Sequence, residues 1–461
     1  MTPVQTQKIE QLKAGFQGAI LLPSDAGYEG ARAIWNAMID KRPAVIARCT
    51  STADVVRAVK FAKDNALVLA IRGGGHNIAG SALCDGGIVI DLSQMKAVKV
   101  DAATRRAIVE GGATLADLDA ATQSHGLATP LGINSTTGVA GLTVGGGFGW
   151  LSRKFGMTVD NLESAEVVTA SGEVVQASAT QHPDLFWALR GGGGNFGVVT
   201  AFEYALHEVG PTVFAGAVFY HGEAADDVLR GYRDACARAG DGLTTVLNLT
   251  TAPPAPFLPE AVHGKPVVAV LGMWSGALDD GDAATSPFRH LAEPIVDLFG
   301  PMPYRTMQSL IDPLYPRGLH NYFNSAFVPA LDDAVMQVLT TAYRGVPNPL
   351  SELHVHHLGG AMARVPSDAT AFATRDQDFI VNVVARTPTA EHFDTVRDWA
   401  RAIPGALGSG PAYVNFTGEG GTDRVRASYP PATYHRLVAV KDRYDPDNLF
   451  RLNQNIQPST T

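Results

Sequence analysis

His76 stands at the end of a run of three glycines, Gly73, Gly74 and Gly75, that follows a strand-like segment. Glycine adopts positive φ at little steric cost, so consecutive glycines can turn several backbone N–H groups toward one point. Such a group of donors binds an anion, for example a pyrophosphate. Because an imidazole nitrogen is a nucleophile, His76 could bond to a ring that emerges from this anion site. The alternative is that His76 is a solvated loop residue.

Glycine forms further clusters along the chain. A loop at 138–149 resembles 73–75, and two such loops could hold the two ends of a dinucleotide; tight structural turns are the alternative. A third cluster at 191–197 contains a GxGxxG pattern. A Rossmann fingerprint must follow a strand and open a helix, but here a helix-like segment precedes the pattern and a strand-like one follows. We therefore reject a Rossmann site. Arg190, just before this cluster, is interpreted as closing a helix C-terminus, with phosphate binding as the alternative.

Three histidines, His354, His356 and His357, fall in a strand-like run at 351–365. Alternation along a strand places His354 and His356 on one face, about 7 Å apart, and His357 on the other. Two histidines without a matched carboxylate make a poor metal site, so no metal is predicted. The remaining interpretations are a half-exposed strand and a wall of a substrate pocket.

The elements that must position these residues form two kinds of region. Residues 43–205 consist of short β-rich runs punctuated by glycine, including a β-α-β unit around a helix at 50–66 and a hairpin at 164–178. Residues from about 206 to 400 alternate strand-like and helical runs, which predicts an α+β domain with an antiparallel sheet. A tail with a helix at 434–444 follows.

The composition is that of a globular protein, with 46% apolar and 18% charged residues. The net charge of −9 disfavours nucleic acid as a partner. Three cysteines without a CxxC pair support neither a disulfide framework nor a zinc site. No signal peptide and no membrane-spanning run is apparent, so we expect a cytoplasmic protein with no membrane partner and no obligate protein partner.

Three segments of the chain resemble one family. They are RGGGHNIAGSALCDGGIVIDLSQMK, GINSTTGVAGLTVGGGFGWLSRKFGMTVDNL and, in the tail, YHRLVAVKDRYDPDNLFRLNQNIQP. They resemble the berberine-bridge-enzyme-like, or 6-hydroxy-D-nicotine-oxidase-like, FAD-linked oxidoreductases of the vanillyl-alcohol-oxidase superfamily. The resemblance implies a PCMH-type FAD-binding domain built from both chain ends, at 1–205 and 406–461. It also implies a central substrate domain at 206–405, with an antiparallel sheet covered by helices.

The resemblance further implies which residues hold the cofactor. His76 would carry FAD through an 8α-histidyl bond. The residues implied around the pyrophosphate are Arg72, Gly73, Gly74, Gly75, Asn77 and Ser81. Those implied along the flavin and its phosphates are Gly132, Asn134, Thr136, Gly138, Gly141 and Gly146, with Asn161, Val167 and Asn453 near the cofactor.

One departure from the family's pattern concerns Asn134. Many members carry a cysteine that forms a second flavin bond, and this chain has Asn134 at the matching position in GINSTTGVAG. The comparison of these motifs therefore implies that FAD is attached through His76 alone.

The tail holds the candidate base. A strand at 412–418 would place Tyr413 and Asn415 on one face, and in the family a matching Tyr-x-Asn strand points at flavin and substrate. The resemblance implies Tyr413 as the catalytic base and Asn415 near the cofactor, with interface packing as the alternative. A phenol is mostly protonated at neutral pH, so a base role requires a hydrogen-bond acceptor or a nearby positive charge. Weaker candidates for the substrate pocket are Tyr322, His354 and His356.

The implied activity is oxidation of an alcohol, amine or sugar-type small molecule by hydride transfer to flavin N5. Oxygen is the expected acceptor and hydrogen peroxide the expected product. The alternatives are a same-fold dehydrogenase that uses another acceptor and a flavin-containing protein with little turnover. The resemblance is weakest in the region that would form the pocket, so the identity of the substrate stays open.

Overall fold

A parallel β-α-β unit lies in the first part of the fold. The computed structural model describes residues 3–408, 411, 413–418 and 422–459. The predicted unit is confirmed, with a third parallel strand inserted between its two strands. Its helix begins where Ser51 Oγ accepts a hydrogen bond from the backbone N–H of Asp54 at 3.3 Å, a typical N-cap. The elements here are α1 (Pro3–Lys13), β1 (Ala19–Leu21), α2 (Tyr28–Arg32), β2 (Val45–Arg48), α3 (Thr52–Asp64), β3 (Leu69–Arg72) and β4 (Ile88–Asp91).

The second sheet is antiparallel, with five strands in the order β5-β6-β10-β8-β9. The predicted hairpin is confirmed, because β8 and β9 pair from Ser164 opposite Ser178 to Val168 opposite Val174. The elements here are β5 (Val98–Asp101), β6 (Arg106–Glu110), α4 (Leu115–Gln123), β7 (Leu127–Ala128), α5 (Val139–Val144), α6 (Ser152–Phe155), β8 (Leu162–Val168), β9 (Val174–Ser178), α7 (Pro183–Leu189), β10 (Val198–Ala205) and β11 (His207–Glu208).

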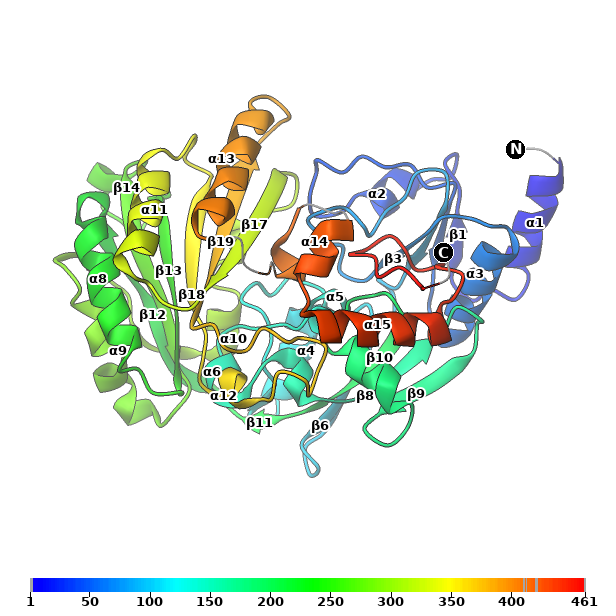
Figure 1. The fold of residues 1–461 in the computed structure, drawn as a ribbon, viewed down its shortest axis with the longest axis horizontal. Coiled ribbons are helices and arrows are strands. Elements are labelled where there is room, and N and C mark those ends of the chain that lie inside the picture. Colours follow the sequence, from blue (N-terminus) through cyan, green and yellow to red (C-terminus); the bar gives the residue numbers. More distant parts are fainter. Residues whose placement is uncertain (1–2, 409–410, 412, 419–421, 460–461) are drawn as a thin grey trace.

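The predicted antiparallel sheet of the central region is confirmed. It has eight strands in the order β15-β12-β14-β13-β18-β19-β17, with β16 paired to β12. Helices α8, α9, α11 and α13 cover one of its faces (Figure 1). The elements are β12 (Thr212–His221), α8 (Ala225–Cys236), β13 (Leu243–Thr251), β14 (Pro266–Trp274), α9 (Gly281–Arg289), β15 (Pro294–Asp297), β16 (Gly300–Pro303), α10 (Tyr304–Gln308), β17 (His320–Val328), α11 (Asp333–Arg344), β18 (Glu352–His357), α12 (Ala361–Arg364), β19 (Phe379–Thr387) and α13 (Phe393–Ala406).

Side chains of this third sheet alternate between its faces, as the pleat requires. Leu353 and Val355 of β18 are fully buried in the core beneath the covering helices. Burial of such side chains contributes about 1.5–3 kcal/mol each, and a slip of one residue would put polar side chains in their place. The apolar row therefore fixes the register, and it turns His354 and His356 toward the opposite face.

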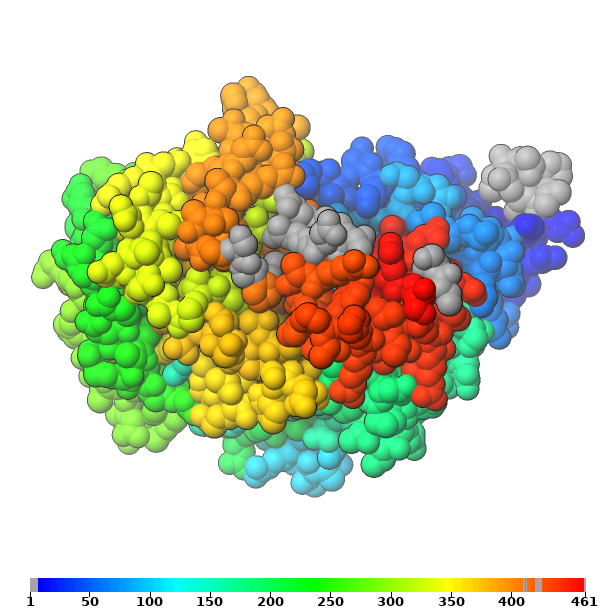
Figure 2. All heavy atoms as spheres, in the orientation of Figure 1, coloured from blue at the N-terminus to red at the C-terminus, as the bar shows by residue number. Residues whose placement is uncertain are grey.

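The C-terminal segment returns to the first half of the chain. Helix α15 (Pro431–Tyr444), drawn in red, lies across the region of α7 and the second sheet (Figures 1 and 2). Lys441 Nζ and an Asp445 carboxylate oxygen are 2.7 Å apart, and both side chains are fully buried. Asp445 also accepts the backbone N–H groups of Leu449 and Phe450, at 2.8 Å each, which fixes the turn after the helix. In the part of the chain that the structure describes, no helix is long and apolar enough to cross a membrane.

The strand predicted at 412–418 is wrong. Val414–Phe416 form a 3-10 turn, η6, and the backbone N–H of Phe416 donates to the carbonyl of Tyr413 at 2.9 Å. Ala412 lies outside the described residues. The segment runs on to α14 (Thr422–Ala427). Tight turning, rather than strand alternation, therefore sets the directions of the side chains here.

Candidate active site

A cavity of about 320 Å³ lies between the third sheet and the first two sheets, within the size range of small-molecule sites. Its lining runs from Trp35 to Gln454 in the sequence, so only the folded chain creates it. Glycine-rich loops line one part, and aromatic and histidine side chains line another. The predicted site residues that line it are Gly73, Gly74, Gly75, His76, Asn77, Ser81, Gly132, Asn134, Gly138, Gly141, His354, His356, Tyr413, Asn415 and Asn453.

The first two glycine-rich loops touch through their backbones. A Cβ on Gly74 would lie 2.5 Å from Gly138 Cα, and a Cβ on Gly138 would lie 2.4 Å from the Gly74 nitrogen. Gly75 has φ +72°, a conformation that glycine adopts without strain. We call these two loops, 73–75 and 138–141, the glycine cradle. Side chains at the contact between the loops would push them apart, so glycine is required there.

His76 is held in one orientation beside the glycine cradle. The Trp35 ring stacks on its imidazole, with centroids 5.2 Å apart and planes 17° apart. Thr136 Oγ1 lies 3.1 Å from His76 Nε2 and donates its own proton to Asn134 Oδ1 at 2.6 Å. The threonine oxygen therefore accepts a hydrogen from Nε2, which leaves a lone pair on Nδ1. Burial lowers the pKa of His76 to about 4, so the imidazole is a neutral nucleophile.

The third glycine cluster, at 191–197, also lines the cavity. The sequence analysis did not predict a role for this cluster at the site. Gly193, Gly194 and Gly197 all contribute to the wall, and Asn453 Nδ2 donates to the Gly194 carbonyl at 3.0 Å. The cluster follows α7 and precedes β10, so rejection of a Rossmann fingerprint was correct. The criterion applied to 73–75, consecutive glycines beside a strand, would have identified this loop.

Arg190 does follow the last residue of α7, and its Nη2 donates to the Ala369 carbonyl at 3.0 Å.

Three residues predicted to hold the cofactor lie away from the cavity. The Arg72 guanidinium donates to the Ala31 carbonyl and is buried beneath the glycine cradle. Asn161 Nδ2 donates to the carbonyl oxygens of Phe155 and Met157, at 2.9 Å each, and so braces a turn. Val167 is fully buried in the core under the second sheet. Each of these side chains contributes to the packing or hydrogen bonding of the fold, and their role in holding the cofactor stays a prediction.

Thr136, Gly146 and Tyr322 also differ from their predicted placement. Thr136 reaches the site through its contact with His76, and at Gly146, which has φ +123°, a Cβ would lie 2.9 Å from Met157 Cε. Tyr322 packs under the covering helices, on the face of the sheet away from the cavity. Strand alternation gives the cavity position to its neighbour Phe323.

The third sheet supplies the wall opposite the glycine cradle. All six residues of β18 are buried, so the interpretation of a half-exposed strand is wrong. His354 and His356 line the cavity with ring centroids 5.9 Å apart, and Asn382 of β19 pairs with His354 in the sheet register. His357 faces the other way, and Arg153 Nη1 lies 2.9 Å from its Nε2.

A buried network of Glu352, Arg386 and Tyr315 lies beside His354 and fixes its position. Arg386 Nη2 lies 2.7 Å from Glu352 Oε1, and Tyr315 Oη donates to the same oxygen at 2.5 Å. His354 Nε2 lies 2.9 Å from Tyr315 Oη. Burial by itself raises the pKa of Glu352, but Arg386, His354 and Tyr315 outweigh it and hold that pKa well below its ordinary value. Glu352 is therefore an anion whose charge Arg386 neutralises.

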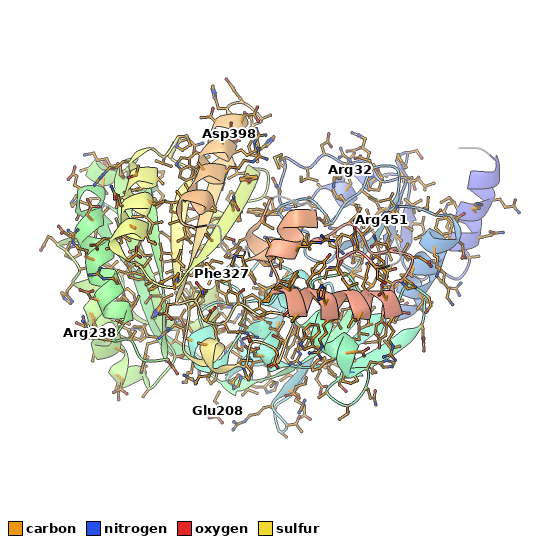
Figure 3. All side chains as sticks on the ribbon, viewed as in Figure 1. Arg32, Glu208, Arg238, Phe327, Asp398 and Arg451 are labelled. Atoms are coloured by element: carbon orange, nitrogen blue, oxygen red, sulfur yellow. The ribbon has the colours of Figure 1, made fainter. Side chains whose placement is uncertain are left out.

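Tyr413 lies in the cavity wall with its hydroxyl fixed by two donors. Its oxygen accepts the backbone N–H of Gly147 at 2.8 Å and Asn415 Nδ2 at 2.9 Å. Phe327 of β17, at the junction of the two parts of the molecule (Figure 3), has its ring centroid 6.5 Å from that of Tyr413. Burial raises the pKa of Tyr413 to about 12. The predicted pairing of Tyr413 with Asn415 holds, although the 3-10 turn creates it.

Comparison with known proteins gives the context for this geometry. Residues 43–178 match the FAD binding domain model, and residues 412–457 match the berberine and berberine-like model. An FAD-linked oxidoreductase of Dictyostelium discoideum is 30% identical over 98% of this chain and 97% of its own. The (R)-6-hydroxynicotine oxidase of Paenarthrobacter nicotinovorans is 30% identical over 96% and 97%. The crystal structure of 6-hydroxy-D-nicotine oxidase from Arthrobacter nicotinovorans, 30% identical, superposes with a TM-score of 0.87 over 96% of this chain and 98% of that one.

The residues present fit FAD. The glycine cradle has no room for a Cβ at the contact of Gly74 with Gly138, so its backbone stays open to a diphosphate. Of the described residues that line the cavity, none carries a carboxylate that would repel phosphate. The chain therefore belongs to the berberine-bridge-enzyme-like FAD-linked oxidoreductases of the PCMH/vanillyl-alcohol-oxidase superfamily and is an FAD-dependent oxidoreductase.

Proposed function

We propose that this enzyme holds FAD covalently through His76 and oxidises a small alcohol, amine or sugar-type molecule, with oxygen as acceptor and hydrogen peroxide as product. The observation that supports this best is the position of His76 in the cavity wall beside the glycine cradle, held by Trp35 and by Thr136 Oγ1 at 3.1 Å from its Nε2. Bound FAD would supply a hydride acceptor at N5. In this proposal residues 1–205 and 406–461 form the FAD-binding domain and residues 206–405 the substrate domain.

A single covalent bond is part of the proposal. Asn134 offers no sulfur for a second bond, and its Oδ1 is occupied by the Thr136 hydroxyl at 2.6 Å. Tryptic mass spectrometry of the holoenzyme should find flavin only on the peptide that contains His76. An adduct on Cys84, or on any peptide without His76, would contradict the single bond.

Tyr413 is the proposed proton acceptor from the substrate's hydroxyl or amine. The Gly147 N–H and the Asn415 side chain both donate to its oxygen, and such donors stabilise a phenolate. Because burial raises the pKa of Tyr413 to about 12, the phenolate is the minor form at neutral pH. Flavin reduction by substrate should therefore accelerate as pH rises.

The proposed function is tested by anaerobic mixing of the holoenzyme with candidate substrates, followed by loss of the visible absorbance of oxidised flavin. Substrates that reduce the flavin are then turned over in air while hydrogen peroxide is measured. Stoichiometric peroxide supports the oxidase. Turnover with an artificial acceptor but without peroxide would show a dehydrogenase, and absence of reduction by every substrate would indicate a protein with little turnover.

A further inference from the structure

We propose that the substrate is an uncharged and largely apolar alcohol or amine, whose polar group is held by His356 and Asn382. This inference rests on the proposed function, because it assumes that the substrate is oxidised in the cavity between the glycine cradle and the third sheet. Of the alcohol, amine and sugar-type molecules in the proposed function, it keeps the uncharged and largely apolar alcohols and amines and excludes sugars and ionic molecules.

The charge of the wall excludes ionic substrates. Among the described residues that line the cavity there is no Asp, Glu, Lys or Arg. Beside His354, Glu352 and Arg386 neutralise each other, and both side chains are buried. A carboxylate, phosphate or ammonium group would therefore enter without a counter-ion, which disfavours its binding.

Apart from polar side chains that are already hydrogen-bonded within the protein, among them Tyr315, His354 and Tyr413, the remaining wall of this part of the cavity is apolar. It is formed by the side chains of Trp35, Ile133, Phe148, Ile311, Phe323, Val384 and Phe416. A sugar unit carries several hydroxyl groups, and each one that is buried without a hydrogen-bond partner weakens binding. The ring faces favour an aromatic or aliphatic body instead.

Two polar atoms in this wall lack a protein partner. His356 Nε2 and Asn382 Oδ1 are buried, and neither has a hydrogen-bond partner in the described part of the chain. Both residues line the cavity, on the adjacent strands β18 and β19. Neither side chain forms any other hydrogen bond within the described part of the chain, so its remaining polar groups are free to bind a ligand in the cavity. Burial and the neighbouring His354 hold the pKa of His356 well below its ordinary value, so its ring is neutral and offers one donor and one acceptor.

His356 and Asn382 therefore bind the polar group of the substrate and orient it. The bonds that break and form in the oxidation involve the flavin and the proposed base. The substrate C–H bond breaks with its electron pair, which leaves as hydride to the flavin. The O–H or N–H proton passes to the proposed base, and the carbon–oxygen or carbon–nitrogen double bond forms. One hydroxyl or amine group suffices, because its hydrogen goes to the proposed base while its oxygen or nitrogen accepts hydrogen bonds from the donors that His356 and Asn382 also carry.

The substrate class is tested with three matched sets of compounds on the anaerobic holoenzyme. The first contains uncharged alcohols such as 1-phenylethanol together with amines that are neutral at the assay pH, the second carboxylate counterparts such as mandelate, and the third oligosaccharides such as cellobiose. We expect flavin reduction by the first set at least about 100-fold faster than by the others. Faster reduction by carboxylates or sugars overturns the inference and leaves the proposed function intact. If no set reduces the flavin while dithionite does, the proposed function fails, and the inference with it.

The residue assignment is tested on the best substrate with His356→Gln and Asn382→Leu. Each should raise KM at least about 10-fold with a smaller change in kcat, because the lost contact is to the substrate. Asn382→Leu should also keep or raise Tm, since it removes an unpartnered carboxamide; a purely structural role would lower Tm and leave KM unchanged. His263→Gln, at a histidine outside the cavity lining, is the matched control and should change neither constant. KM values within twofold of wild type for both cavity variants would overturn the assignment.

Discussion

Replacement of Tyr413 by phenylalanine separates its proposed chemistry from its structural role. The variant keeps the ring, which packs with its centroid 5.1 Å from Phe148 and 5.0 Å from Phe416, and removes only the hydroxyl. Two donors then lose their acceptor, the backbone N–H of Gly147 and one hydrogen of Asn415 Nδ2. The second hydrogen of Asn415 keeps its bond to the Leu142 carbonyl at 3.0 Å.

The expected magnitudes follow from these contacts. A buried donor without a partner costs about 1–3 kcal/mol, and water in the cavity can reach the vacated place, so we expect a loss of about 1–3 kcal/mol in the free energy of unfolding. Loss of a general base slows the reaction by about 10²-fold or more. In the wild type, the phenolate fraction of Tyr413 grows about tenfold per pH unit below a pKa of about 12. The rate should show this rise, and Tyr413→Phe should abolish it.

The assay is stopped-flow reduction of the holoenzyme flavin by substrate under anaerobic conditions, across the alkaline pH range. The matched control is Tyr220→Phe, because the Tyr220 hydroxyl donates to the Phe288 carbonyl at 2.8 Å and accepts the Leu291 N–H at 3.3 Å, far from the cavity lining. It should lose stability without loss of rate. If Tyr413→Phe slows reduction less than about threefold, or if the variant keeps the pH rise of the wild type, Tyr413 is not the base.

Three further predictions concern the cofactor bond and two buried carboxyl groups. His76→Ala should release its flavin on denaturation, whereas the wild type should show a fluorescent flavin band on a denaturing gel; a retained band in the variant would refute the bond. Glu352→Gln should lower the free energy of unfolding by about 3–5 kcal/mol in urea at neutral pH, because Arg386 stays buried without its counter-ion. Since the pKa of Glu352 is held below its ordinary value, this difference should be present above about pH 4.3 and shrink as pH falls; a pH-independent difference would argue against the pairing. Burial raises the pKa of Asp119 to about 7, so it lowers stability as pH rises from about 4 to 7. Asp119→Asn should remove that slope and raise stability above pH 7 by at most about 4 kcal/mol, measured as Tm against pH, where an unchanged slope would disprove it.

The features that the sequence determined by itself are those set by local physical chemistry. Glycines are required where two backbones touch, so the two loops of the glycine cradle could be identified from the glycine runs at 73–75 and 138–149, and the position of His76 from the first of them. Helix α3 follows from its Ser51 cap and its apolar spacing, and the hairpin of β8 and β9 follows from its turn. Alternation along β18 placed His354 and His356 on one face because the pleat has a fixed period.

Other features depended on contacts between segments far apart in the sequence, and only the tertiary structure decided them. Arg72 and Asn161 carry the polar groups expected of cofactor ligands, yet Arg72 Nη1 donates to the Ala31 carbonyl and Asn161 Nδ2 donates to the Phe155 carbonyl. The tail around Tyr413 forms a 3-10 turn because it must fit between the third sheet and the loop at Gly147. The network of Glu352 with Arg386 and Tyr315 joins three strands or loops that no local pattern connects. Local patterns fix which backbone shapes a segment can adopt, whereas the partner of each polar side chain is chosen only when the chain is packed.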